Sequence, residues 1–253
     1  MNRMKSLAAK YGITVCIYLG LGLLYYWVTE NGWANPFLFP RVGAIVKAFS
    51  KNEGIMLLNL VSSMKMMIPS ILISLGIALA VGTLLGRNAR LRDALHPILY
   101  TFSVVPAILL SPFVLLLAPN FWVASVFLIV YSTVWSTLFA TITGIMTIDR
   151  RYLDKAATLE LTGMKRMTKV ILPAASPSIL SGFINSLRNT FVMLVYAEMY
   201  GSRYGMGFFV KKYSEFGLYD HTWAGFIFMV VVLVAVMQIF EQMKKHILKW
   251  TMN

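Results

Sequence analysis

The stretch DKAATLELTGMKRMTKVILPAASP, residues 154–177, is the most polar and charge-dense part of an otherwise apolar chain. It is basic on balance, its residues are compatible with a helix, and the helical pattern stops at Leu172-Pro173. What such a segment does depends on the sequence on either side of it.

The composition of the chain is that of a membrane protein. Of its 253 residues, 58% are hydrophobic and only 13% are charged, whereas a soluble domain carries about 25% charged residues. The net charge of +13 comes from basic residues that lie between long uncharged runs. A nucleic-acid-binding protein gathers such residues on one solvated face, so we expect the lipid bilayer and not a nucleic acid as the partner. The single cysteine, Cys16, excludes an intrachain disulfide framework.

Six membrane-spanning helices are predicted, because each crossing of the hydrocarbon core takes about 20 mainly apolar residues. Residues 94–148 contain no Asp, Glu, Lys or Arg, which is too long for one span, and Ala118-Pro119-Asn120 interrupts them. The predicted spans are residues 11–29, 66–86, 97–118, 121–148, 174–199 and 222–240. Strands of alternating polarity are absent from the sequence, so the expected fold class is an all-α membrane protein.

Between the first two spans, residues 36–65 are mixed in character. Apolar residues recur there at helical spacing, at Val42, Ile45, Val46 and Phe49. This spacing predicts a short amphipathic helix that lies at the outer membrane interface.

The distribution of Lys and Arg predicts the orientation of the chain. If the N-terminus is cytoplasmic, fifteen of the 23 basic residues fall on cytoplasmic segments, among them Arg3, Lys5 and Lys10. Both termini are therefore expected inside. Residues 1–35 are expected to form an anchor helix and an outer loop, because no small-residue cleavage site follows the first apolar run. Residues 36–248 would then form the transmembrane core.

Catalytic and metal-binding patterns are missing. The sequence has no G-x-x-x-x-G-K-[ST] loop to hold ATP phosphates. His96, His221 and His246 each lack a second ligand three or four residues away, so no metal site is expected. The serines in the spans have no nearby His or carboxylate, and nothing supports an intramembrane protease. We therefore expect a transport role without catalytic residues and without a cofactor in this chain.

Residues 149–171, called the coupling segment below, are predicted to form two short cytoplasmic helices. Asp149 can cap a helix that begins at Arg150. Thr162 can cap a second short helix that runs through Lys169, and Leu172-Pro173 then opens the fifth span. From residue chemistry alone, the alternative is a basic amphipathic segment resting on anionic lipid.

The spacing of this segment resembles the EAA motif of ABC importer permeases, in which E-A-A and a bend glycine precede an L-P pair. Asp154, Lys155 and Ala156 stand for E-A-A, and Glu160 occupies the position of the bend glycine. Gly163, three residues later, is expected to supply the bend. The resemblance places the coupling site at Asp154, Lys155, Ala156, Glu160, Gly163, Leu172 and Pro173.

The resemblance extends over residues 36–248 and is to permeases of the nitrate/sulfonate/taurine type. The stretches that carry it, in order, are Ser63-Met64-Lys65, Gly82 to Arg87, Pro173 to Pro177, Ala197-Glu198-Met199 and Gly205-Met206-Gly207. It implies a type I ABC importer permease fold in a bacterial cell membrane. It also implies a dimer with an identical or related permease, separate ATPase subunits that hold ATP and Mg, and an extracytoplasmic binding protein.

The solute implied by the resemblance is small, polar and anionic, such as a sulfonate, nitrate, taurine or a vitamin precursor. Nucleotide-driven closure of the ATPase would switch access between the two sides of the membrane. Two other classes remain open: a self-contained secondary carrier or channel, and a membrane scaffold subunit that does not transport.

Two groups of polar residues in and after the fifth span are candidate transport residues. Charges inside a span usually face a protein interior or water. Asn185, Arg188 and Asn189 share one helical surface and are expected to line the substrate pathway, although Arg188 has an alternative role as a structural residue. Glu198 is expected to hold the following Gly205 and Gly207 as an outer gate.

Overall fold

The computed structural model describes residues 2–249, with side chains from residue 12 to residue 249, and every regular element in this range is helical. The side chains of Arg3, Lys5 and Lys10, used above for orientation, lie outside that range. The chain forms two compact units. One unit comprises the chain up to Leu57 with Phe209–Phe228, and the other comprises Leu58–Phe208 with the chain from Met229 onward.

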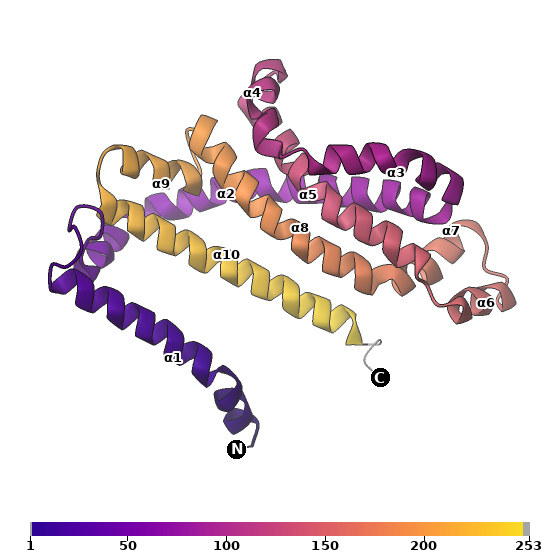
Figure 1. Ribbon diagram of the computed structural model, residues 1–253, viewed down its shortest axis with the longest axis horizontal. Coiled ribbons are helices and arrows are strands. Elements are labelled where there is room, and N and C mark those ends of the chain that lie inside the picture. The colour runs from indigo at the N-terminus through magenta and orange to yellow at the C-terminus, as the bar shows by residue number, and fades with distance from the viewer. Residues whose placement is uncertain (1, 250–253) are drawn as a thin grey trace. The chain divides into compact units, whose positions relative to one another are not determined.

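Ten α-helices and one π-helical turn make up the described chain (Figure 1). They are α1 (Asn2–Glu30), α2 (Val42–Arg87), α3 (Ala89–Val104), α4 (Ala107–Leu117), α5 (Phe121–Met146), α6 (Arg150–Thr158), α7 (Gly163–Arg166), η1 (Met167–Ile171), α8 (Leu172–Gly201), α9 (Met206–Glu215) and α10 (Tyr219–Ile247). Five helical stretches within them are long and apolar enough to cross a membrane, and the bent pair α3–α4 makes a sixth if it counts as one span. The predicted all-α fold with about six spans is confirmed.

The third predicted span is broken and not straight. Residues 97–118 were expected to form one helix, but α3 and α4 meet at a bend of 88°. Pro106 lacks an N–H group, and the residue before a proline is pushed into extended backbone. Val105 adopts that conformation, with φ −70° and ψ 117°. In Figure 1, α4 accordingly points away from the axis of α3.

The amphipathic helix predicted between the first two spans is not a separate element. Val42 begins α2, which continues without interruption for 46 residues to Arg87. Polar side chains along it bond to carbonyl groups of their own helix: Asn52 Nδ2 lies 2.7 Å from Ala48 O, and Ser70 Oγ lies 2.8 Å from Met66 O. Because these groups are satisfied locally, they do not end the helix.

In the unit that contains α1, aromatic residues join the helices to the loop before α2. The Tyr25 hydroxyl donates to Pro40 O at 2.9 Å, and Trp223 Nε1 donates to Leu38 O at 2.9 Å. The rings of Tyr25 and Trp223 lie 5.5 Å apart beside buried Ile45. These contacts fix the start of α10 against the loop.

In the other unit, α5 and α8 run side by side and are joined by small and hydroxyl side chains (Figure 1). Thr133 Oγ1 lies 2.8 Å from Thr190 Oγ1, and Thr137 Oγ1 lies 2.7 Å from Ser186 Oγ, with all four residues buried. At Gly182, a Cβ atom would lie 2.6 Å from the Ser136 carbonyl oxygen. Such small and hydroxyl residues allow close packing of helices in lipid.

Helix α2 packs on α5 through two glycines spaced four residues apart. A Cβ atom at Gly82 would lie 2.7 Å from Thr141 Cβ, and one at Gly86 would lie 2.9 Å from Ile145 Cβ. Helix α5 is therefore held closely by α2 and by α8.

We expect Gly182→Ala to destabilise the protein, because the added methyl group collides with backbone of α5. Overpacking of this kind costs about 1–3 kcal/mol. The matched control is Gly76→Ala on α2, where a Cβ atom would meet nothing within 4 Å. Thermal unfolding of both variants in detergent should show a lowered Tm only for Gly182→Ala, and equal Tm values would contradict this packing.

Candidate functional site

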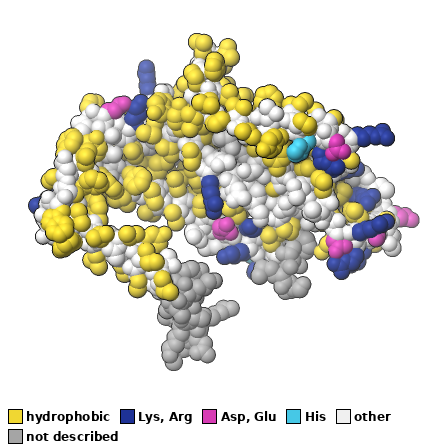
Figure 2. Space-filling view, viewed as in Figure 1, with side chains coloured by type: hydrophobic (Ala, Val, Ile, Leu, Met, Phe, Trp, Pro, Cys, Tyr) yellow, Lys and Arg dark blue, Asp and Glu magenta, His cyan; other side chains and the backbone are white. Residues whose placement is uncertain are grey.

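Charged side chains gather over α6 and α7, in the coupling segment (Figure 2). Asp149 caps α6 as predicted, and its side chain accepts a hydrogen bond from the Arg151 backbone N–H at 2.9 Å. The same carboxylate pairs with the Arg151 guanidinium at 2.6 Å. Hydrogen bonds from the Arg151 side chain, and then from its backbone, hold the pKa of Asp149 below its usual range. The contacts between Asp149 and Arg151 thus stabilise the first turn of α6.

The C-terminal end of α6 turns at Glu160. The N–H of Leu161 bonds to Ala156 O and the N–H of Glu160 bonds to Ala157 O, both at 2.9 Å. This is a Schellman motif, in which the residue after the C-cap adopts a left-handed conformation that favours glycine. Glu160 has φ +50° and Gly163 has φ +54°. Gly163 thus has the left-handed backbone expected of a bend, but Glu160 has it as well, so the chain bends at both residues.

The second short helix continues directly into the fifth span. Thr162 occupies the N-cap position of α7, but its side chain makes no capping hydrogen bond. Helix α7 passes through η1 into α8, and α8 begins at Leu172-Pro173 as predicted, without a break in the helical path. The Leu172 N–H bonds to Met167 O, five residues back. This π turn immediately precedes Pro173, which has no N–H to donate.

One face of the coupling segment is packed against the membrane helices. Leu153 of α6 lies against the cluster that contains Met167 and Ile171, and Ala156 is completely buried. Other side chains of the segment are exposed, among them Leu159 at 67% and Met164 at 75%, and these are called its open face below.

A groove of about 420 Å³ lies between α6, η1 and the start of α8. Its lining residues are Tyr152, Lys155, Ala156, Leu159, Lys169, Val170, Pro173 and Ala174. The structure thus brings together Lys155, Ala156 and Pro173 of the predicted coupling site, whereas Asp154 lies exposed and outside the groove lining.

The predicted outer-gate residues meet at the start of α9. Glu198 is buried at 1% exposure, and its Oε2 accepts a hydrogen bond from the Gly207 N–H at 2.8 Å. Gly205 has φ +114°, and a Cβ atom at Gly207 would lie 2.6 Å from Val195 O. Both positions therefore need glycine, and the structure places both glycines against the Glu198 carboxylate.

The contacts of Glu198 with Gly205 and Gly207, together with those of Asn59 and Ser63, are called the α9 joint below. Asn59 and Ser63 were not predicted from the sequence to take part in it. The Asn59 side chain accepts the Gly205 N–H at 2.8 Å, and Ser63 Oγ accepts the Met206 N–H at 3.0 Å. Three successive amide groups at the start of α9, those of residues 205–207, are thus bound by side chains from α2 and α8. No local signal indicates such partners, since Asn59 and Gly205 are 146 residues apart.

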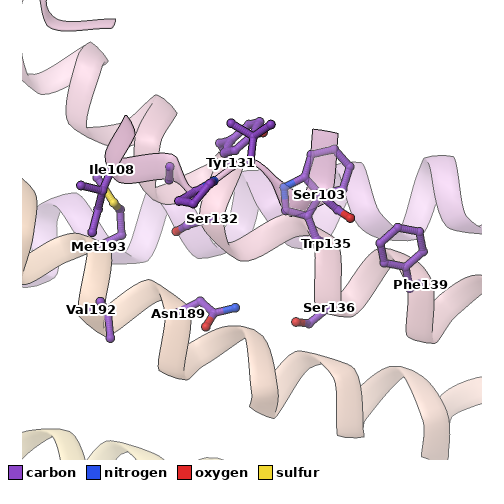
Figure 3. A pocket seen from close by; sticks show the side chains of 13 residues that line it. Ser103, Ile108, Tyr131, Ser132, Trp135, Ser136, Phe139, Asn189, Val192 and Met193 are labelled. Carbon is purple, nitrogen blue, oxygen red and sulfur yellow. The ribbon is translucent and has the colours of Figure 1, made fainter. Parts of the chain in front are cut away.

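The predicted pathway residues Asn185, Arg188 and Asn189 are all exposed on α8, and Asn189 lines a cavity. That cavity, of about 470 Å³, lies between α5, α8 and the α3–α4 bend (Figure 3). Its aromatic wall was missed: Tyr131, Trp135 and Phe139 line it from α5. Their spacing of four residues in the sequence is the signal that identifies a shared helix face.

Among the side chains that the structure describes, no three His, Cys, Asp or Glu residues lie close enough to hold a metal ion. The polar contacts described above include the Asp149–Arg151 pair in the coupling segment and the hydrogen bonds that hold the start of α9. A groove and a cavity are open beside these contacts. Fold and site together define a helical membrane protein with several spans.

Comparison with known proteins identifies the family to which this chain belongs. Residues 72–252 match the family described as binding-protein-dependent transport system inner membrane component. The chain belongs to this family of ABC importer permeases, and the predicted resemblance is confirmed. A chain of the inward-facing MetNI methionine ABC transporter matches with a TM-score of 0.64 at 15% identity, over 77% of this chain and 97% of that chain. The type I importer permease fold is thereby confirmed.

Several relatives are similar in sequence. The aliphatic sulfonates transport permease protein SsuC of Bacillus subtilis is 30% identical over 71% of this chain. The nitrate import permease protein NrtB of Leptolyngbya laminosa is 30% identical over 52% of it, and the bicarbonate transport system permease protein CmpB of Synechococcus elongatus is 30% identical over 53%. The matched regions span 65% of SsuC, 47% of NrtB and 49% of CmpB.

We expect Glu160→Gly to stabilise the end of α6, because a left-handed backbone costs a non-glycine residue about 1–2 kcal/mol. Hydrogen exchange at the Leu161 amide should slow at least about fivefold. Glu160→Ala is the control, since it removes the same charge but keeps the strained backbone. An equal gain in both variants would mean that charge, and not conformation, limits this turn.

For the joint at α9, we expect Glu198→Leu to weaken the helix start and Glu198→Gln to preserve most of it. The Gln carbonyl still accepts the Gly207 N–H, whereas Leu leaves this buried donor unpaired at a cost of about 1–3 kcal/mol. Hydrogen exchange at the Gly207 amide would measure the difference. Equal acceleration in both variants would contradict the hydrogen bond as the cause.

Proposed function

We propose that this chain forms the substrate pathway of an importer for a small anionic solute and is driven by separate ATPase subunits. ATP and Mg would bind to those subunits, and docking would take place on the coupling segment with Leu172-Pro173. The open face of that segment carries this proposal. Leu159 and Met164 are exposed apolar side chains in the most polar part of the chain, and Leu159 also lines an apolar groove. Exposed apolar patches mark protein interaction sites.

A displacement of α6 can reach the membrane helices through packed contacts. Leu153 packs on η1, which continues into α8 without a break. Helix α8 is bonded to α5 and carries Asn189 in its middle and Glu198 near its other end. Binding of one nucleotide state of the ATPase would therefore bias both the cavity and the α9 joint. In this proposal, Glu198, Gly205 and Gly207 form the outer gate.

The proposed topology has both termini and the coupling segment in the cytoplasm. Its support is the distribution of basic residues, fifteen against eight. Residues 1–35 would be the anchor helix and outer loop, and residues 36–248 the permease core. An extracytoplasmic binding protein would deliver solute at the opposite face, near the start of α9. A second permease, identical or related, would complete the pathway.

The anionic character of the solute is supported by the relatives, whose names specify aliphatic sulfonates, nitrate and bicarbonate. In the structure, Asn189 lies in the cavity, and Arg188 and Asn185 lie on the same exposed surface of α8. A guanidinium group at this place would attract an anion toward the cavity.

Leu159→Asp and Met164→Asp test the docking. Both side chains are mostly exposed, so we expect the folded permease to persist while ATPase assembly and ATP-driven uptake are lost. The control is Phe216→Asp, which alters a side chain that is 70% exposed between α9 and α10. Co-purification with the ATPase and ATP hydrolysis stimulated by the binding protein are the measurements.

Three results would overturn the proposal in different ways. Normal assembly and uptake in Leu159→Asp would remove the coupling segment as the docking site. Uptake by the wild-type chain without any ATPase would indicate a secondary carrier or channel. A stable complex with the ATPase that moves no solute would indicate a scaffold subunit.

A further inference from the structure

The cavity between α5, α8 and the α3–α4 bend has a rigid aromatic wall. The rings of Tyr131 and Trp135 lie 5.5 Å apart at 85°, and those of Trp135 and Phe139 lie 6.4 Å apart at 26°. The Tyr131 hydroxyl donates to Phe102 O near the end of α3. Because the first ring is bonded to a second helix and the rings contact one another, the wall is preorganised.

One hydrogen-bond donor in this wall lacks a partner. Trp135 Nε1 is buried, and no acceptor among the described residues is bonded to it. An indole N–H can only donate, and buried polar groups are nearly always paired. The cavity is therefore suited to a ligand that brings an acceptor atom to Trp135.

Further neutral donors face the same space. Figure 3 shows the amide end of Asn189 on α8 and the hydroxyl of Ser136 on α5 turned into the space between the two helices. Ser103 and Ser132 also line the cavity, but their hydroxyl groups donate to Tyr100 O and Ile129 O. None of the residues that line the cavity has a charged side chain. Neutral donors hold an anion through hydrogen bonds without the full attraction of a cation, and a conduction site must release its ligand.

The size of the cavity indicates what the ligand carries besides its acceptor atoms. A volume of about 470 Å³ falls within the range of sites for organic ligands, about 300–1,000 Å³. An inorganic oxyanion would fill a small part of it and would leave the aromatic wall and Val192 without contacts. A short apolar body attached to the anionic group would contact both.

We propose that this cavity is a substrate site that selects an organic oxyanion, a sulfonate or carboxylate on a short apolar body, over an inorganic oxyanion. The oxygens accept hydrogen bonds from Trp135 Nε1 and Asn189, and the body lies against the rings of Tyr131 and Phe139. This assignment rests on the proposed transport function and adds to it the kind of anion and the residues that recognise it.

The test uses the complex of this chain with its ATPase, with butanesulfonate as the probe and nitrate as the competitor. Equilibrium binding of radiolabelled butanesulfonate is measured without the binding protein. We expect Trp135→Phe, which keeps the aromatic wall but removes the N–H, to raise Kd about 10- to 100-fold. Asn189→Leu should act in the same direction, and nitrate should compete weakly. The matched control is Trp122→Phe on the same helix, at a half-exposed position outside the cavity.

Failure of this inference is distinguishable from failure of the transport function. If the wild-type complex shows no ATP-driven uptake of any anion, the proposed function fails. If uptake is normal but Kd is unchanged in Trp135→Phe, or nitrate competes as well as butanesulfonate, the inference is overturned.

A second measurement covers the case in which the variants do not assemble. In wild-type protein labelled with 5-fluorotryptophan, the Trp135 resonance should shift when butanesulfonate is added. A shift caused by lipid or by dimer formation, with none caused by butanesulfonate, would show that the cavity holds another occupant and would overturn the inference.

Discussion

The close contact between α5 and α8 is the constraint on which the rest of their compact unit depends. In lipid, apolar side chains gain little by leaving one hydrocarbon environment for another, so helices associate through close packing and polar contacts. The Thr133–Thr190 and Thr137–Ser186 pairs supply the polar contacts, and Gly182 allows the backbones to approach. Helix α5 carries the aromatic wall of the cavity, and α8 carries Glu198 of the α9 joint. The geometry of both sites therefore depends on the contact between these two helices.

Helix α8 connects two sites that are distant along the chain. Its start is continuous with η1, on which the coupling segment packs, and near its end Glu198 holds the Gly207 amide. A rigid helix with a contact at each end transmits displacement without a dedicated series of side chains. The same helix also contributes Asn189 to the cavity. One element thus reaches the surface proposed for docking, the proposed substrate site and the proposed gate.

The sequence could predict the features that depend on composition and local chemistry. Uncharged runs predicted the number of spans, and the Asp149 cap follows from one residue before a helix. The bend at Val105-Pro106 was missed because it lies inside a continuous apolar run with no polar residue to mark a boundary. The left-handed backbone of Glu160 was missed because this conformation favours glycine. The partner of Gly205, Asn59, depends on long-range packing that a single sequence does not record.

The π turn at Met167–Ile171 places one more residue between α7 and α8 than an α-helical turn would. A residue in an α-helix accounts for about 100° of rotation and about 1.5 Å of rise. Relaxation of η1 to α-helical hydrogen bonding would therefore turn α8 about its own axis by roughly that angle relative to α7. Such a rotation changes which side of α8 faces α5, and it would carry Asn189 out of the cavity while a different residue entered. The extra residue of this turn thus sets which side of α8 faces α5.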